Sequence, residues 1–219
     1  MPVEAVIFDM DGVLIDSERT WEQARMAFSR KMGKAHWTPE HQRRAMGHTS
    51  REWVAMFQEA IGTDLPFETV YADLKANVLA QYAENLPLLP GALDAVRLAA
   101  GRYQVGLASG SSLPVIRRVL ELSGLGAMLD AFVSGDEVAR GKPAPDIYLE
   151  TARRLGVPPG ACIAVEDSGN GIRAAKAAGM VALAVPTREH PITDGALALA
   201  DRVLASLLEF TVELVDSLA

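Results

Sequence analysis

Two aspartates follow the first apolar run of the chain, in the stretch "AVIFDMDGVLIDSE" at residues 5–18. Asp9 and Asp11 are two residues apart, so their side chains lie on the same side of an extended backbone. A second pair of carboxylates, Glu166 and Asp167, ends another apolar run, "CIAVED". An Asp-Gly turn accounts for Asp11 but explains neither Asp9 nor the second pair.

Carboxylates gathered in one cleft repel each other and do not all stay ionised unless a cation binds among them. Hard oxygen ligands favour Mg²⁺, which keeps coordination places for water and phosphate. The histidines and the single cysteine, Cys162, do not have the spacing of a zinc site, and Cys162 lies in an apolar run typical of a buried structural thiol. The sequence therefore predicts Mg²⁺ as the cofactor.

Two further stretches suit a phosphate group. In "LASGSS" (107–112), Ser109 ends an apolar run and precedes Gly110 and a helical pattern, so a hydroxyl and backbone N–H groups are available at a helix start. The alternative is an ordinary helix N-cap at Ser111 or Ser112. In "GKPAPD" (141–146), Lys142 stands in a stiff, proline-set turn that could hold its ammonium against a phosphate or an aspartate. A solvated lysine is the alternative.

Short apolar runs that alternate with helical patterns must position these residues. We expect strands at 5–9, 104–109, 131–135, 162–167 and 181–185, and helices at 91–100, 112–122, 145–156 and 170–178. Such alternation predicts an α/β fold, a Rossmann-like parallel sheet with helices on both faces. Ligands bind at the carboxyl ends of the strands in these sheets, so the candidate residues should converge at one edge although they are far apart in sequence.

Residues 17–86 interrupt the alternation and contain helical patterns only. Three apolar stripes recur there at helical spacing: Trp21, Ala24, Phe28 and Met32; Trp53, Phe57, Ala60 and Ile61; Tyr71, Leu74, Val78 and Tyr82. We interpret these stripes as core, and predict a small helical domain at 17–86 inserted into a core domain formed by 1–16 and 87–219. The tail, 207–218, is predicted to form a final amphipathic helix.

The composition limits the partners. The net charge of −7 disfavours binding to nucleic acid or to an anionic membrane. No apolar run approaches the length of about 18 residues needed to span a bilayer, and the N-terminus has no secretory pattern. We expect a monomeric cytoplasmic protein whose partner is a small-molecule phosphorylated substrate.

Taken in order, "DMDG" at 9–12, Ser109, Lys142 in "KPAPD" and "EDSGNG" at 166–171 resemble the four motifs of the haloacid dehalogenase superfamily, a group of phosphotransferases with an aspartate nucleophile. The resemblance covers 1–16 and 87–190. The inserted helices resemble the α-helical cap of the subgroup that contains β-phosphoglucomutase and many sugar-phosphate phosphatases.

The resemblance implies a role for each aspartate of the first motif. Asp9 would attack phosphorus and form an aspartyl-phosphate, which splits hydrolysis into two displacements. Asp11 would protonate the leaving alcohol and then deprotonate the attacking water. Asp9, Asp167 and the backbone carbonyl of Asp11 would hold Mg²⁺, with Glu166 either a direct ligand or a support of the other ligands.

The same resemblance implies that Ser109, aided by the backbone N–H of Gly110, hydrogen-bonds the transferring phosphoryl group. Lys142 would bind that group and neutralise Asp9, and the Lys142-Pro143 peptide bond is a candidate for the cis form. Because dehalogenases of the superfamily need no metal and lack the second aspartate, Asp11, Glu166 and Asp167 favour phosphoryl transfer over carbon–halogen cleavage.

Phosphatase and mutase remain alternatives, because both use the same core and differ in the cap. In "RRAMGHTSREW" (43–53), Gly47, Ser50 and Arg51 are similar to a cap stretch of β-phosphoglucomutases, with one extra residue before the arginine. Arg51 would then hold a distal phosphate, or it is a solvated arginine at a helix start. We favour a phosphatase of sugar or sugar-alcohol phosphates. A non-catalytic binding module on the same fold is a remote third hypothesis, disfavoured because Asp9 and Asp11 are both present.

Overall fold

The computed structural model describes residues 2–33, 37–38, 40–41, 44, 50–187, 191–192 and 195–218. Six parallel strands form one sheet in the order β3-β2-β1-β4-β5-β6. They are β1 (Ala5–Phe8), β2 (Gln104–Ser109), β3 (Ala131–Ser134), β4 (Cys162–Glu166), β5 (Val181–Ala184) and β6 (Arg202–Val203). The predicted fold class and all five predicted strands are confirmed. β6 was not predicted, because two exposed residues give no apolar pattern.

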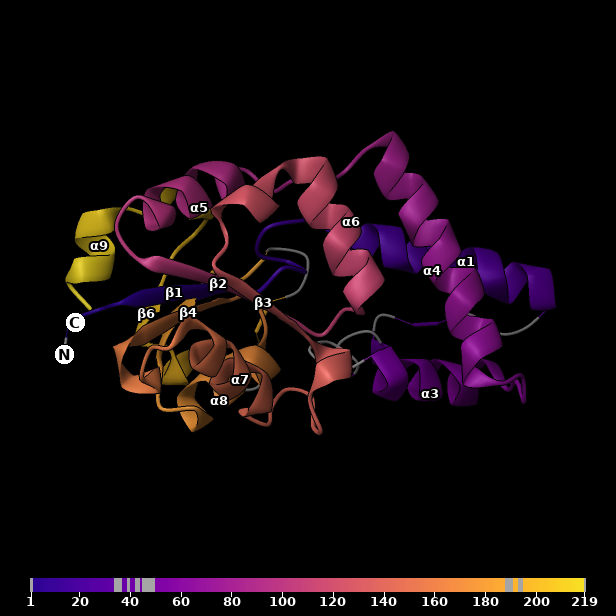
Figure 1. Cartoon of the computed structure of the whole chain (residues 1–219). Helices are drawn as coiled ribbons and strands as arrows, with labels where there is room; N and C mark the ends of the chain where they lie inside the picture. The colour runs from indigo at the N-terminus through magenta and orange to yellow at the C-terminus, as the bar shows by residue number, and fades with distance from the viewer. Residues whose placement is uncertain are drawn as a thin grey trace.

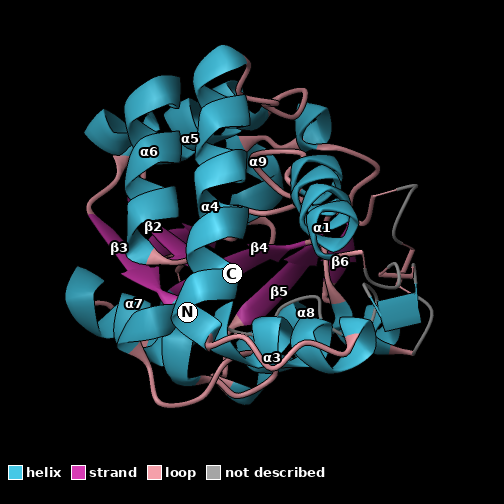
Figure 2. Ribbon diagram, turned by 90° about the vertical axis from the view of Figure 1, so that its right-hand side faces the viewer, coloured by secondary structure: helices cyan, strands magenta, loops and turns pink. Residues whose placement is uncertain are grey.

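Helices cover both faces of the sheet (Figure 2). On one face lie α5 (Ala92–Ala100) and α6 (Leu113–Ser123), and on the other α7 (Asp146–Leu155) and α8 (Gly169–Ala177). Side chains alternate along β1 accordingly: Val6 and Phe8 belong to the first core, and Ala5 and Ile7 to the second. Short 3₁₀ helices connect these elements at Leu125–Met128, Gly135–Glu137, Pro159–Ala161 and Ala196–Leu199.

The helical insert after β1 contains α1 (Glu18–Met32), α3 (Ser50–Ile61) and α4 (Phe67–Glu84). These helices lie beyond the carboxyl ends of the strands, while both chain termini lie at the opposite end of the sheet (Figure 1). Most of the three predicted stripes is buried, with Tyr71, Leu74, Val78 and Tyr82 all at 6% exposure or less. Aromatic rings dominate the interior, as in the edge-on contact of Trp21 with Trp53 at 5.2 Å between ring centroids.

The segments that enter and leave the insert run side by side. Ile15 and Leu88 form an antiparallel bridge, and the Asp16 N–H donates to the Pro87 carbonyl at 2.8 Å. A second bond runs from the Leu89 N–H to the Leu14 carbonyl at 3.0 Å. The insert is thus joined to the sheet through two adjacent, hydrogen-bonded segments.

The predicted helix at 207–218 is wrong in its extent. A 3₁₀ turn at Leu207–Glu209 and a short helix, α9 (Val212–Asp216), occupy the segment. Phe210 interrupts them because its ring packs on Phe8, 5.7 Å between centroids. The Thr211 hydroxyl then accepts from the Leu214 N–H and begins a new helix. Two leucines of the predicted apolar helix faces, Leu122 and Leu149, are exposed, at 37% and 41%.

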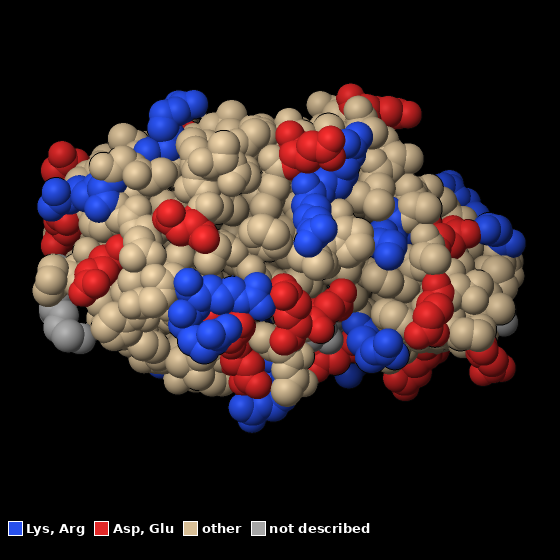
Figure 3. Space-filling model, in the orientation of Figure 1, with Lys and Arg blue, Asp and Glu red and all other residues tan. Residues whose placement is uncertain are grey.

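Acidic and basic side chains are interspersed over the face of the molecule drawn in Figure 3, which has no continuous basic area. Among the described residues, no helix combines the length and apolar character required to cross a bilayer.

Candidate active site

The first and fourth predicted motifs meet at the centre of the sheet edge. β1 and β4 are neighbours, with Phe8 opposite Val165, and the Asp9 N–H donates to the Val165 carbonyl at 2.9 Å. Asp9 therefore lies next to Glu166 and Asp167. The strand order reverses between β1 and β4, and this is where ligands bind in open α/β sheets.

Asp9, Glu166 and Asp167 form a buried carboxylate cluster whose closest oxygens all lie within 4.8 Å of one another. Burial raises the pKa of Asp9 to about 8; the charge of Lys142 opposes this shift, and the charges of Glu166 and Asp11 add to it. Burial and the charges of Glu166 and Asp9 also raise the pKa of Asp167 well above its ordinary value. A hard cation would relieve this repulsion, so the oxygen donors fit the predicted Mg²⁺.

Lys142 is buried between two of these carboxylates. Its Nζ donates to Asp9 Oδ1 at 2.6 Å, to Glu166 Oε1 at 2.5 Å and to the Ala108 carbonyl at 3.2 Å, so all three ammonium hydrogens have acceptors. Burial by itself lowers the pKa of Lys142, but the charges of Asp9 and Glu166 outweigh burial and raise it. The Lys142-Pro143 peptide bond is cis, as predicted.

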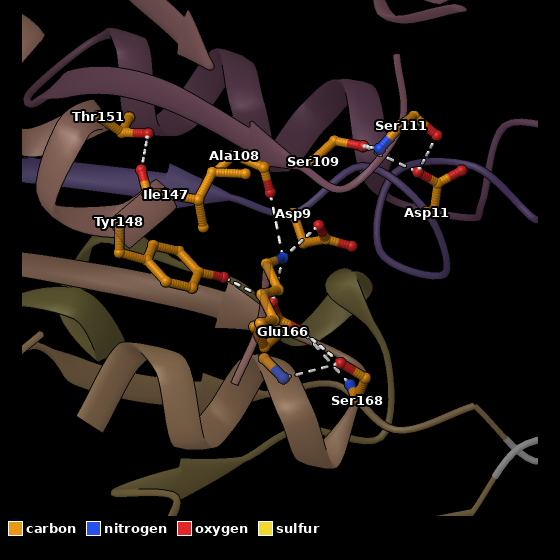
Figure 4. A network of polar contacts seen from close by, with 12 residues as sticks. Asp9, Asp11, Ala108, Ser109, Ser111, Ile147, Tyr148, Thr151, Glu166 and Ser168 are labelled. Carbon is orange, nitrogen blue, oxygen red and sulfur yellow. Dashed lines mark hydrogen bonds and ion pairs between the residues drawn. The ribbon is translucent and has the colours of Figure 1, made fainter. Parts of the chain in front are cut away.

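Glu166 is hydrogen-bonded through both carboxylate oxygens (Figure 4). Oε1 accepts from the Tyr148 hydroxyl at 2.6 Å in addition to Lys142, and Oε2 accepts from the Ser168 hydroxyl at 3.1 Å and the Ser168 N–H at 3.3 Å. Gly171 permits this packing, because a Cβ there would lie 1.8 Å from Glu166 Cδ. These donors hold Glu166 in one orientation against Lys142.

Tyr148 was not singled out by sequence reasoning. It occupies the buried face of α7, and its ring lies 5.1 Å from Lys142 Nζ. A tyrosine on an apolar helix face reads as core, so nothing in its position signals that its hydroxyl reaches a carboxylate of β4.

Asp11 lies on the other side of Asp9, next to the end of β2 (Figure 4). Its Oδ2 accepts from the Ser109 and Ser111 hydroxyls, both at 2.9 Å, and the Ser111 N–H donates to Ser109 Oγ at 3.0 Å. Asp11 Oδ1 is buried and has no hydrogen-bond partner in the part of the chain that the structure describes. The N-cap alternative for Ser111 is therefore wrong: its hydroxyl binds Asp11, and Ser112 is the residue at the N-cap position of α6.

Two glycines, Gly110 and Gly12, lie at the carboxyl edge of the sheet. Gly110 follows Ser109 directly and so lies at the same edge of the sheet; its binding of a phosphoryl group stays a prediction. Gly12 has φ of +82°, and a Cβ there would lie 1.9 Å from Asp167 Oδ2, so the loop after Asp11 can approach the acidic cluster only with glycine at this position.

Arg51 is not part of this cluster. It lies on α3 with an exposed side chain, pairs with Glu68 at 3.7 Å and stacks on Phe67, whose ring centroid is 4.3 Å from Cζ. Its charge also opposes the effect of burial on the pKa of Asp136, in the turn after β3. Its neighbours Gly47, His48 and Thr49 lie outside the described residues.

Residues 3–179 match the family model of the haloacid dehalogenase-like hydrolases. The chain belongs to this family. Hexitol phosphatase B of Escherichia coli strain K12 is 36% identical over 213 residues, which cover 94% of both chains. The phosphorylated carbohydrates phosphatase of Thermotoga maritima is 35% identical over 181 residues, 81% of this chain and 82% of that protein.

A solved structure of a relative has the same fold. CbbY from Rhodobacter sphaeroides in complex with phosphate has a TM-score of 0.84 at 31% identity, covering 94% of this chain and 96% of that one. The predicted family is therefore confirmed. The relatives are consistent with the predicted enzyme class, a haloacid dehalogenase-type phosphatase acting on small phosphorylated metabolites.

Proposed function

We propose that this protein is a Mg²⁺-dependent phosphatase that hydrolyses sugar or sugar-alcohol phosphates through an aspartyl-phosphate on Asp9. The observation that carries the proposal is the position of Asp9, buried between the ammonium of Lys142 and the carboxylates of Glu166 and Asp167, at the strand order reversal. An anionic carboxylate can approach an anionic phosphate only when positive charge lies next to both groups and reduces their repulsion.

In the first step, a carboxylate oxygen of Asp9 bonds to phosphorus and the bond from phosphorus to the ester oxygen breaks. Asp11 supplies the proton that the departing alkoxide needs. In the second step, Asp11 takes a proton from water, the water oxygen bonds to phosphorus, and the carboxylate of Asp9 leaves. The Ser109 hydroxyl, which donates to Asp11 Oδ2 in the structure, would turn its one hydrogen to a phosphoryl oxygen when substrate binds, beside the Gly110 N–H.

Asp9, Asp167 and the backbone carbonyl of Asp11 would hold Mg²⁺. The cation supplies charge neutralisation between the carboxylates and the substrate phosphate. Glu166 has the role of orienting Lys142, because each of its oxygens already accepts from protein donors. Asp11 Oδ1, which is buried and has no hydrogen-bond partner among the described residues, would carry the proton that passes to the leaving oxygen.

Residues 17–86 form a cap over this site, and residues 1–16 with 87–219 form the core that carries it. The cap opens and closes about the two adjacent segments at Asp16-Ser17 and Leu86-Pro90. A closed cap limits access to small substrates, so a folded phosphoprotein should not be dephosphorylated.

Phosphatase is favoured over mutase. A bisphosphate intermediate needs a cap residue for the second phosphate, and Arg51, the candidate for that role, is already paired with Glu68 and stacked on Phe67. Two of the relatives support the same choice by their names, hexitol phosphatase B and the phosphorylated carbohydrates phosphatase.

The test is Mg²⁺-dependent phosphate release from a panel of sugar, hexitol and deoxysugar phosphates, with β-glucose 1-phosphate included and glucose 6-phosphate assayed in the same tube. Release that disappears with EDTA and in Asp9→Asn supports the phosphatase. Glucose 6-phosphate formed without matching phosphate release would identify a mutase instead, and silence in both assays would favour a binding module.

A further inference from the structure

Arg25 is a buried cation inside the helical insert. It lies on α1, two helical turns after Glu18, and is 3% exposed. Its closest charged contact is Glu18, with 3.9 Å between the Nη2 and Oε2 atoms, which is too long for a hydrogen bond. Its Nε is buried with no hydrogen-bond partner among the described residues. Donors of a buried guanidinium are costly to leave unsatisfied, so this arginine calls for an acceptor.

Aromatic rings surround the guanidinium. Its Cζ lies 5.7 Å from the ring centroid of Trp37 and 5.9 Å from that of Trp53, which in turn contacts Trp21 edge-on. Such rings hold the cation in place and offer flat apolar surfaces to a ligand. Burial lowers the pKa of Arg25 to about 10, while the charges of Glu18 and Glu22 oppose the shift, so the cation remains charged at neutral pH.

Glu18 connects Arg25 to the phosphoryl-transfer site. Burial raises the pKa of Glu18 to about 7, the charge of Arg25 opposes the rise, and the charges of Asp11 and Asp16 add to it. The charge of Glu18 also contributes to the raised pKa of Asp167. Glu18 is thus within electrostatic reach of the catalytic carboxylates on one side and of Arg25 on the other.

Together these groups suit a polyhydroxy chain. Glu18 offers a carboxylate, Arg25 offers the Nε–H that has no partner in the described part of the chain, and Trp37 and Trp53 offer indole rings. Hydroxyl hydrogens can be accepted by Glu18, hydroxyl oxygens can accept from Arg25, and C–H groups can pack on the rings. A second phosphate fits less well, because the negative charges of Glu18 and Glu22 already act on Arg25. We propose that Glu18 and Arg25 form the subsite that binds the hydroxyl groups of the substrate, and that this subsite selects polyhydroxy monophosphates. This inference rests on the proposed phosphatase function.

The first test uses the unaltered enzyme with three esters: a hexitol 6-phosphate, hexyl phosphate and a hexitol bisphosphate. Sites built to hydrogen-bond hydroxyls reject analogues that lack them, so kcat/KM for the hexitol phosphate should exceed that for hexyl phosphate by about 100-fold or more. The bisphosphate should also be the poorer substrate. Equal values for the hexitol and hexyl esters, or a preference for the bisphosphate, would overturn the proposal.

The second test compares Arg25→Met with Arg30→Met, a matched change at an exposed arginine in the last turn of the same helix. Methionine keeps an unbranched apolar side chain in the aromatic cluster and removes the donors. Arg25→Met should raise KM for the hexitol phosphate about tenfold or more and leave phenyl phosphate hydrolysis within about twofold. Arg30→Met should change neither. An equal loss on both esters would mean a structural role, and no loss would mean that Arg25 does not bind substrate.

Glu18→Gln covers the case in which Arg25→Met does not fold. It keeps the size of the side chain and weakens hydroxyl binding, so it should narrow the preference for hexitol over hexyl phosphate by about tenfold. An unchanged preference would contradict the proposal. The two proposals can be distinguished by their failures. If no ester is hydrolysed in the presence of Mg²⁺, the proposed phosphatase function is wrong. If hexitol and hexyl phosphates are hydrolysed equally well, only the proposed subsite is wrong.

Discussion

The ammonium of Lys142 lies 2.5 Å from a carboxylate oxygen of Glu166, and the same ammonium binds Asp9 at 2.6 Å. One cation thereby joins the ends of β1 and β4 across the central pair of strands. A buried pair of this kind is strongly destabilising when one partner is removed, because the remaining charge loses its compensation.

Lys142→Met should therefore cost both activity and stability. We expect kcat to fall about 100-fold or more, since a charge that stabilises the transferring group is lost. The free energy of unfolding should fall by about 3 kcal/mol, because Asp9 and Glu166 remain buried without their cation. Urea unfolding with and without Mg²⁺ measures this, and wild-type stability in the variant would contradict the structural role given to Lys142.

Tyr148→Phe isolates the hydroxyl that holds Glu166. The change leaves the ring in the core and removes one donor to a charged acceptor, so kcat should fall about tenfold and stability by about 1–2 kcal/mol. The control is Tyr103→Phe, which removes the hydroxyl that donates to Asp216 at 2.7 Å at the far end of the sheet. The control should affect stability only; an unaffected kcat in Tyr148→Phe would mean that Glu166 does not need this hydrogen bond.

The metal-free protein should lose stability as the pH rises. Asp9 has an ordinary pKa of 3.8 and a pKa of about 8 when folded, so the folded state binds the proton more tightly. This contribution is complete below about pH 4 and is lost progressively up to about pH 8. Mg²⁺ binds the ionised carboxylate, so the rise in Tm that it causes should be larger at pH 8 than at pH 5.5.

Differential scanning calorimetry at the two pH values provides the check. Asp9→Asn should abolish most of the pH dependence of the Mg²⁺-induced shift. Asp94→Asn, a change at an exposed aspartate in the first turn of α5 that pairs with Arg97, should leave it intact. A Mg²⁺-induced shift independent of pH in the unaltered protein would argue against Asp9 as a ligand.

Asp11→Asn should discriminate between leaving groups. General acid catalysis contributes about 10²–10⁴-fold when the departing group is a poor one, such as the alkoxide of a sugar alcohol. A nitrophenolate leaves without a proton. The rate at which Asp11→Asn forms the aspartyl-phosphate from p-nitrophenyl phosphate should therefore fall much less than the rate from a hexitol phosphate. Burst-phase kinetics on the two esters separates the steps, and equal losses in that step would remove Asp11 from its role as acid.

The strands could be predicted because parallel strands buried on both faces have continuous apolar sequences. The carboxylate cluster could be predicted because Asp9, Glu166 and Asp167 stand at the ends of such apolar runs. The hydroxyls were harder to place. Tyr148 reads as core and Ser111 as a helix cap, because side-chain direction depends on how α7 and α6 dock on the sheet. The tail was misjudged because a single buried contact, Phe210 with Phe8, overrode the helical pattern.

Arg25 shows the same limit within the insert. Arg25 shares the buried face of α1 with Trp21, Ala24 and Phe28, but arginines on helices are usually exposed, so its burial was not predicted. Charge within an apolar stripe is nevertheless a feature that sequence reasoning can flag for inspection.

The central claim is that Asp9 carries the phosphoryl group. Its most direct test is a rapid acid quench during turnover of a hexitol phosphate, followed by borohydride reduction and peptide mass mapping. An aspartyl-phosphate on Asp9 is reduced to homoserine at position 9, and we expect that product only when substrate and Mg²⁺ are both present. Phosphate release with unmodified aspartate at position 9, or homoserine at position 11 instead, would contradict the account.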